Sequence, residues 1–208
     1  MKTILCYGDS NTWGSNPLDG SRFDIHTRWP GVMRDYLGDE YWVIEEGLCG
    51  RTTVWDDPLD EGRNGRTYLF PCLESHKPID LVILILGTND LKGHFKASPE
   101  DIASGVDILV NIIQLSQCGV AERAPRVLLV APPKVGKLSE FALSFEGARK
   151  KSKLFGEFFR QVADLHGCDF LDASMIIKSS PLDGIHFDAE AHRILGKTLG
   201  EMVLRILG

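Results

Sequence analysis

The stretch Asp80-Leu81-Val82-Ile83-Leu84-Ile85-Leu86 is an unbroken apolar run after its first residue, and the polar turn Gly87-Thr88-Asn89-Asp90 follows it directly. A short apolar run bounded by turn residues is typical of a strand that is buried on both faces of a parallel sheet. Ligands of open parallel sheets bind outside the carboxyl ends of the strands. The stretch therefore predicts a central strand, and it predicts that the turn behind this strand belongs to a functional site.

The rest of the chain continues this alternation of strand and turn. Four more segments have the apolar character of buried strands: Thr3–Tyr7, Tyr41–Glu45, Arg126–Ala131 and Asp169–Leu171. Helical patterns lie between and after them, over Trp29–Leu37, Tyr68–His76, Pro99–Gln117, Phe145–His166 and Ala189–Leu207. Unbroken alternation with no linker or internal repeat predicts one α/β domain over residues 1–208. We expect a three-layer α/β/α sandwich with a five-stranded, mostly parallel sheet of the flavodoxin-like type.

Composition and charge narrow the class of protein. With 208 residues, 43% of them hydrophobic and 25% charged, the chain has the ordinary values of a globular domain. Its 23 basic and 29 acidic residues give a net charge of −6, so a broad cationic surface is not expected. We therefore expect neither nucleic acid nor a membrane among its partners.

The cysteines and the apolar segments bear on cellular location. Five cysteines are scattered along the chain with no C-x-x-C spacing: Cys6, Cys49, Cys72, Cys118 and Cys168. This usage favours free thiols in a reducing compartment over disulfides or a zinc site. No stretch approaches the ~20 apolar residues of a membrane span, and the chain reaches Gly8-Asp9 too early for the apolar core of a signal peptide. These features predict a cytoplasmic protein.

Three further polar turns resemble the turn behind the central strand. Gly8-Asp9-Ser10-Asn11-Thr12 follows the first strand, Glu46-Gly47-Leu48-Cys49-Gly50-Arg51-Thr52 follows the second, and Asp183-Gly184-Ile185-His186 precedes the last helix. Together the four turns contain a hydroxyl, a carboxamide, an acid with an imidazole, and glycines. These are the groups that acyl transfer needs: a nucleophile, a base, an orienting carboxylate and donors to an oxyanion.

The same four turns carry a family resemblance. In order along the chain they match the Gly-Asp-Ser, glycine, Gly-x-Asn-Asp and Asp-x-x-His blocks of the SGNH hydrolases, also called the GDSL esterase superfamily. The match runs from Tyr7 to His186, which is nearly the whole chain. Finer similarity, to the arylesterase and acyltransferase branch, lies in Arg28-Trp29, Ile44–Leu48, Arg51–Thr53, Asp56–Pro58, Asn64-Gly65 and Leu86–Asp90.

The resemblance implies a serine mechanism, and the residue chemistry agrees with it. Ser10 is then the nucleophile and His186 its general base, although a serine at this position can also simply cap a helix. Asp183 can bond one ring nitrogen of His186 and fix its tautomer while the other nitrogen faces Ser10. The Gly-x-Ser-x-Gly elbow is absent because Thr12 stands where its second glycine belongs, so an α/β-hydrolase fold is not expected.

The resemblance also implies an oxyanion hole. Its donors are the backbone N–H groups of Ser10 and Gly50 and the side-chain amide of Asn89. Three donors that converge from three neighbouring strand ends could hold the charge of a tetrahedral intermediate. Glycine and asparagine are also common turn formers, which is the structural alternative for Gly50 and Asn89.

Other residues offer competing or additional roles. Cys49 could be a nucleophile, although a packing thiol is the commoner use. His192 competes with the catalytic histidine but lies within a predicted helix, and His94 fits a pocket wall. The aromatic residues Trp13, Trp55 and Phe95 flank the blocks and could line a substrate pocket, although aromatic residues are more often core.

The sequence thus predicts a serine esterase that hydrolyses small aryl or acetyl esters, with acyl transfer to alcohols as a further expectation. Its partner would be a small-molecule ester, and we expect no cofactor and no metal. The absence of a G-x-G-x-x-G motif after the first strand argues against a dinucleotide. Lysophospholipase or thioesterase activity and carbohydrate deacetylation stay open. So do a non-catalytic carbohydrate- or lipid-binding role and assembly into a homo-oligomer.

Overall fold

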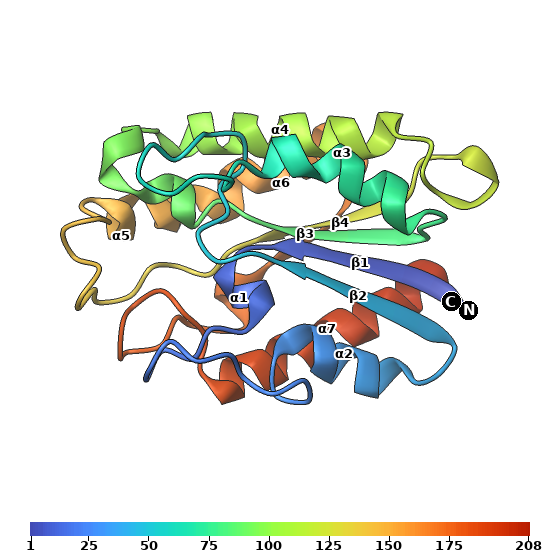
Figure 1. Cartoon of the computed structure of the whole chain (residues 1–208), viewed down its shortest axis with the longest axis horizontal. Coiled ribbons are helices and arrows are strands. Elements are labelled where there is room, and N and C mark those ends of the chain that lie inside the picture. The colour runs from blue at the N-terminus through green and yellow to red at the C-terminus, as the bar shows by residue number, and fades with distance from the viewer.

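A parallel sheet forms the middle layer of the protein in a computed structural model that describes residues 1–208 (Figure 1). Its five strands are β1 (Lys2–Gly8), β2 (Tyr41–Gly47), β3 (Leu81–Ile85), β4 (Arg126–Ala131) and β5 (Asp169–Asp172). The order across the sheet is β2-β1-β3-β4-β5, and every neighbouring pair is parallel. The predicted flavodoxin-like sheet is confirmed, and its strand order reverses between β1 and β3, where such folds bind ligands.

Helices cover both faces of the sheet. They are α1 (Ser10–Trp13), α2 (Trp29–Leu37), α3 (Gly65–His76), α4 (Pro99–Leu115), α5 (Ala148–Lys151), α6 (Phe155–His166) and α7 (Ala189–Leu207). Figure 1 shows α3, α4 and α6 on one face and α2 and α7 on the other. Short 3₁₀ turns span Asn89–Leu91, Gly93–Phe95, Val120–Glu122, Ser152–Leu154 and Ala173–Met175. The expected three-layer α/β/α architecture is therefore present.

One predicted helix is wrong at its amino-terminal end. The sequence predicted a single helix over Phe145–His166, but the structure has α5, a 3₁₀ turn and then α6. Gly147 adopts a left-handed conformation with φ of 77° at the start of α5. The hydroxyl oxygen of Ser152 accepts a hydrogen bond from the Val135 N–H of a neighbouring loop. Tertiary contacts of this kind override a helical pattern.

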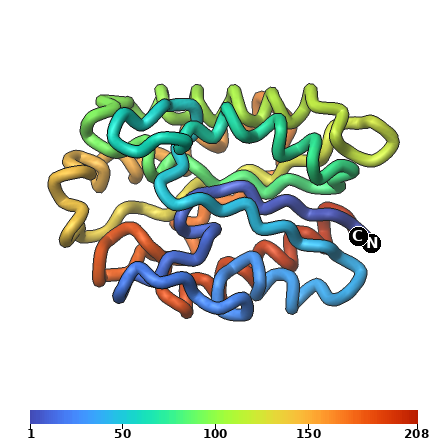
Figure 2. The backbone as a smooth tube through the Cα atoms, in the orientation of Figure 1, coloured from blue at the N-terminus to red at the C-terminus, as the bar shows by residue number.

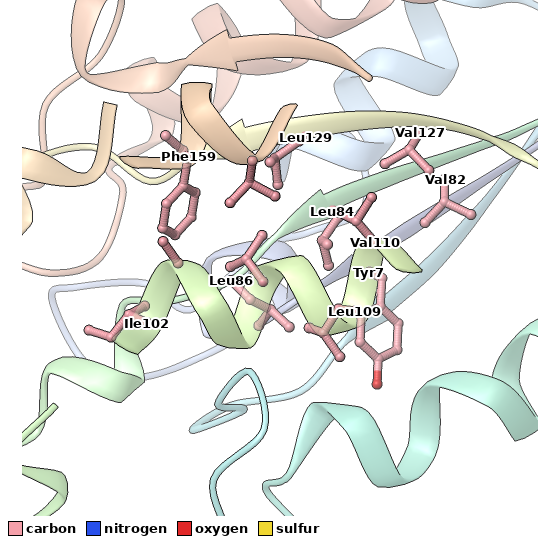
Figure 3. Close-up of a cluster of buried hydrophobic side chains, with 14 of the residues drawn as sticks. Tyr7, Val82, Leu84, Leu86, Ile102, Leu109, Val110, Val127, Leu129 and Phe159 are labelled. Carbon is pink, nitrogen blue, oxygen red and sulfur yellow. The ribbon is translucent and has the colours of Figure 1, made fainter. Parts of the chain in front are cut away.

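Alternate residues of each strand point to opposite faces and feed two hydrophobic clusters. On the face covered by α4 and α6, Val82 and Leu84 of β3 and Leu129 of β4 pack with Leu109 and Phe159 (Figure 3). The other residues of β3 pack on the face that α2 and α7 cover. Burial on both sides explains why β3 is apolar at every position.

The loops that follow the strands gather at one end of the molecule. In Figures 1 and 2 the two termini lie close together at the other end, where the Lys2 ammonium donates to the carbonyl of Leu207. None of the helices combines the length and the hydrophobicity that a membrane-spanning segment needs. All five cysteines are free thiols. The strand ends at the loop-bearing end of the sheet hold the predicted functional turns.

Candidate active site

Ser10 is the first residue of α1, the short helix that follows β1 in the chain. Asp9 is the N-cap of this short helix, and its carboxylate accepts the Asn11 N–H at 2.9 Å. The hydroxyl of Ser10 is therefore not used as a helix cap. It lies 3.0 Å from Nε2 of His186, so the structural alternative for Ser10 is wrong.

His186 is held between Ser10 and a carboxylate. Its Nδ1 lies 2.6 Å from Oδ2 of Asp183, while Oδ1 of Asp183 accepts the backbone N–H groups of Ile185 at 2.8 Å and of His186 at 3.0 Å. Burial by itself would raise the pKa of Asp183, but these hydrogen bonds hold the pKa below its ordinary value. An ionised Asp183 accepts a hydrogen bond from the Nδ1–H group of His186, which leaves Nε2 free to accept a proton from the Ser10 hydroxyl.

Asn11 joins the serine turn to the histidine loop. Its side-chain oxygen accepts the Phe187 N–H at 3.0 Å, and its amide nitrogen donates to the Ile185 carbonyl at 3.4 Å. These partners lie on either side of His186. The sequence analysis missed this role, because the partners are 174 and 176 positions away from Asn11 and no local pattern marks such a contact.

Three hydrogen-bond donors follow β1, β2 and β3, which are adjacent in the sheet. The N–H groups of Ser10 and Gly50 have no acceptor within the protein. The Asn89 amide gives one hydrogen to the Arg51 carbonyl at 3.1 Å, so its second hydrogen is available. Gly50 has a φ of 80°, a conformation that favours glycine. The predicted oxyanion donors are thus all free to bind an anionic oxygen.

Arg51 and Asp90 tie these loops together, and the sequence analysis missed both roles. The Arg51 guanidinium lies 4.2 Å from the centre of the Tyr7 ring and donates to the carbonyls of Gly8, at 2.8 Å, and Glu46. Asp90 accepts hydrogen bonds from the N–H and the hydroxyl of Thr53, in the loop after β2. Burial raises the pKa of Asp90 to about 6, although the Thr53 hydrogen bonds oppose this rise.

The predicted pocket aromatics fall into two places. Trp55 and Phe95 lie together, with ring centres 6.5 Å apart, and both pack against the larger hydrophobic cluster. Trp13 instead contacts Arg22, whose guanidinium lies 5.2 Å from the centre of its ring. An unpredicted aromatic neighbour of the histidine loop is Phe141, which meets the His186 ring edge-on at 5.8 Å.

The competing residues have other surroundings. His192 is buried in α7, where its Nδ1 accepts the Trp29 N–H at 3.2 Å. His94 pairs with Asp57 at 3.2 Å. Burial raises the pKa of the Cys49 thiol, which disfavours the reactive thiolate. None of the three residues is placed as Ser10 and His186 are.

One cluster outside this site brings possible metal ligands together. One ligand atom each of Glu46, Cys72 and His76 lies within 4.8 Å of the others. His76 already bonds Glu46 at 3.0 Å, and burial raises the pKa of the Cys72 thiol to about 12 even though the positive charge of Arg51 acts against this rise. A protonated thiol beside a guanidinium is a poor ligand for a divalent cation.

Comparison with known proteins agrees with the geometry. Residues 6–194 match the model of the GDSL-like lipase/acylhydrolase family. An aryl esterase of M. smegmatis is 43% identical, with both chains fully covered and a TM-score of 0.95. Est24, a carbohydrate acetylesterase from Sinorhizobium meliloti, is 40% identical, with both chains fully covered and a TM-score of 0.96.

A curated acetylxylan esterase of Xylanibacter ruminicola is 23% identical over 203 residues, which are 88% of this chain. The chain spans 39% of that relative's length. The predicted fold and the predicted enzyme class, a carboxylic-ester hydrolase, are confirmed. The chain belongs to the GDSL-like lipase/acylhydrolase family.

Proposed function

We propose that this protein is a serine esterase that cleaves small carboxylic esters through an acyl-enzyme, with Ser10 as nucleophile, His186 as general base and Asp183 as the carboxylate that orients it. One observation carries the proposal. A continuous chain of hydrogen bonds runs from the Ser10 hydroxyl through both ring nitrogens of His186 to Asp183, with distances of 3.0 and 2.6 Å.

The geometry supports the following steps. The Ser10 oxygen attacks the ester carbonyl carbon while its proton passes to Nε2 of His186. The oxyanion that forms accepts hydrogen bonds from the N–H groups of Ser10 and Gly50 and from the Asn89 amide. Collapse of the intermediate expels the alcohol or phenol, which takes the proton from His186. A water molecule then gives a proton to His186 and attacks the acyl carbon. The bond from this carbon to the Ser10 oxygen breaks, the acid leaves, and Ser10 takes the proton back from His186.

Similarity to named relatives supports the substrate class. The likeness to an aryl esterase favours small aryl esters. The likeness to Est24, a carbohydrate acetylesterase, and to an acetylxylan esterase favours acetylated carbohydrates as a second candidate. Rates on phenyl acetate, on an acetylated xylo-oligosaccharide and on a lysophospholipid, measured side by side, separate these classes.

The mechanism is tested with p-nitrophenyl acetate. Ser10→Ala should lose nearly all turnover, because it lacks the proposed nucleophile. Cys49→Ala should keep its turnover, because Cys49 is the competing candidate nucleophile, to which the proposal gives no role. Both variants are checked for native circular dichroism. A folded Ser10→Ala enzyme with wild-type turnover would exclude the serine mechanism. A folded wild-type protein without turnover would instead favour the non-catalytic carbohydrate- or lipid-binding role.

Acyl transfer to alcohols is part of the same proposal. Any nucleophile admitted to the site can discharge an acyl-enzyme, and the apolar pair Trp55 and Phe95 would favour an alcohol over water if it lines the mouth of the site. The ratio of new ester to free acid should rise with alcohol concentration. If only acid forms at every alcohol concentration, the enzyme is a plain hydrolase.

We also place the protein in the cytoplasm, which the five free cysteines support, because such thiols persist in reducing compartments. Fractionation of the cells that make the protein tests this location.

A further inference from the structure

A pocket beside the histidine loop is lined by cationic side chains. It has a volume of about 380 Å³ and twelve lining residues, of which none is acidic and five are basic: Lys134, Lys137, Arg149, Lys153 and Lys178. Ser174 and Ser180 add hydroxyl groups to the wall. Its charge and its hydrogen-bonding groups both suit an anion.

Folding brings these charges together from separate parts of the chain. Lys134 and Lys137 lie in the loop after β4, and Lys178 lies between β5 and α7. Arg149 lies in α5, and Lys153 lies in the 3₁₀ turn that follows α5. The chain as a whole carries a net charge of −6. A local cluster of five positive charges therefore runs against the average composition, which is why the sequence did not indicate it.

The five cations also differ from other basic residues of the chain. None of them forms an ion pair, whereas eight other Lys and Arg residues do. Exposed lysines are often simply hydrated, and on a convex surface hydration alone would explain why they have no ion-pair partner. In a concave site with no acidic residue, like charges repel one another, and a bound anion relieves that repulsion.

The pocket wall is continuous with the loop that carries Asp183 and His186. The Ser180 N–H donates to the His186 carbonyl at 2.7 Å, and the Gly136 N–H donates to the Gly184 carbonyl at 2.7 Å. The Ser179 hydroxyl donates to the Lys134 carbonyl at 3.2 Å. A ligand held by this wall would contact the same hydrogen-bonded unit that positions the histidine.

We propose that this pocket is a binding site for a compact oxyanion, such as a phosphate or carboxylate group, coupled to the esterase site. The anion is either a group of the ester substrate itself or a separate small effector. Arg149 can hold such a group with two parallel hydrogen bonds, and the lysines supply point charges. The kinetic coupling rests on the proposed esterase function, whereas the binding does not.

The binding is tested by calorimetric titration with inorganic pyrophosphate at low ionic strength. The triple variant Lys134→Gln/Arg149→Gln/Lys178→Gln should bind about tenfold or more weakly than the wild type, because it removes three of the five positive charges that line the pocket. The matched control is Lys96→Gln/Lys197→Gln/Arg205→Gln, which removes the same net charge from exposed residues elsewhere. Absent binding, or an equal loss in both triple variants, would overturn the proposal.

Kinetics distinguish the two sources of the anion. If the anion belongs to the substrate, the wild type prefers an acetylated uronic acid over the neutral acetylated sugar, and only the pocket triple loses that preference. If it is an effector, pyrophosphate changes kcat for neutral p-nitrophenyl acetate, and only the pocket triple is insensitive. Binding with neither effect contradicts the coupling. Ser10→Ala should still bind pyrophosphate, because the binding does not need the nucleophile. The binding measurement therefore tests the anion site even if the proposed esterase function is wrong.

Discussion

At the scale of single residues, the site depends on the two hydrogen bonds of one imidazole ring. Local spacing made Asp183 and His186 predictable, because an acid and a histidine three residues apart can meet in one turn. The serine turn was predictable from its place behind the first strand. Asn11 and Arg51 were not, since each acts through backbone groups of distant segments that no local pattern connects.

Asn89→Ala should lower kcat for p-nitrophenyl acetate by about 10²–10³ with little change in KM, because the lost amide acts mainly on the charge that develops in the transition state. Steady-state kinetics measure both constants. A matching loss of ground-state affinity would instead assign Asn89 to substrate binding.

Asn11→Ala should lower kcat about tenfold, because it removes two hydrogen bonds worth about 1 kcal/mol each and loosens the loop around His186. Asn11→Asp keeps the acceptor for the Phe187 N–H but sets a second acceptor against the Ile185 carbonyl, so it should lower kcat as well. Wild-type kcat in Asn11→Ala, or a change confined to KM, would argue against a positioning role.

At the scale of elements, the close approach of two helices depends on a glycine. α7 packs against α2 through Gly196, where an added Cβ would lie 2.7 Å from both the Trp29 carbonyl and the Val32 Cβ. The central strand β3 was predictable because it is apolar throughout. The break between α5 and α6 was not, because it depends on the hydroxyl of Ser152 bonding a loop that is distant in sequence.

His192 in α7 should make folding sensitive to acid. Burial, and the positive charge of His186, lower the pKa of His192 to about 3, so between pH 6.5 and 3 the unfolded chain binds a proton that the folded protein does not. The folded state therefore loses stability as the pH falls through this range. Buried Asp9 and Asp90 have pKa values raised to about 6, so their protonation stabilises the folded state as the pH falls and opposes the effect of His192.

Comparison with His192→Gln isolates the histidine, since the glutamine oxygen can still accept the Trp29 N–H. Between pH 7 and 5 the wild type should lose about 2 kcal/mol more free energy of unfolding than the variant. Urea titrations at the two pH values measure this difference. The same loss in both proteins would mean that His192 titrates normally in the folded state.

At the scale of the whole molecule, we propose that residues 1–208 form one cooperative domain. The two hydrophobic clusters share the sheet as their common wall, so neither can persist without it. Urea unfolding should give coincident transitions by tryptophan fluorescence and far-ultraviolet circular dichroism. Two separated transitions would show that one layer unfolds independently.

The net charge of the molecule does not describe how its charges are distributed over the surface. A net charge of −6 predicts no broad cationic surface, yet folding gathers five cations around one pocket. Charge averages over a chain cannot predict such a cluster, because it depends on which loops meet.

The central claim is that Ser10 is the residue that becomes covalently acylated. The most direct measurement is mass spectrometry after reaction with a p-nitrophenyl phosphonate, whose phosphorus the Ser10 oxygen attacks as p-nitrophenolate leaves. We predict one adduct per chain, on the peptide that contains Ser10, together with loss of esterase activity. Ser10→Ala should gain no adduct. An adduct on Cys49, or full inactivation without modification of Ser10, would contradict the account.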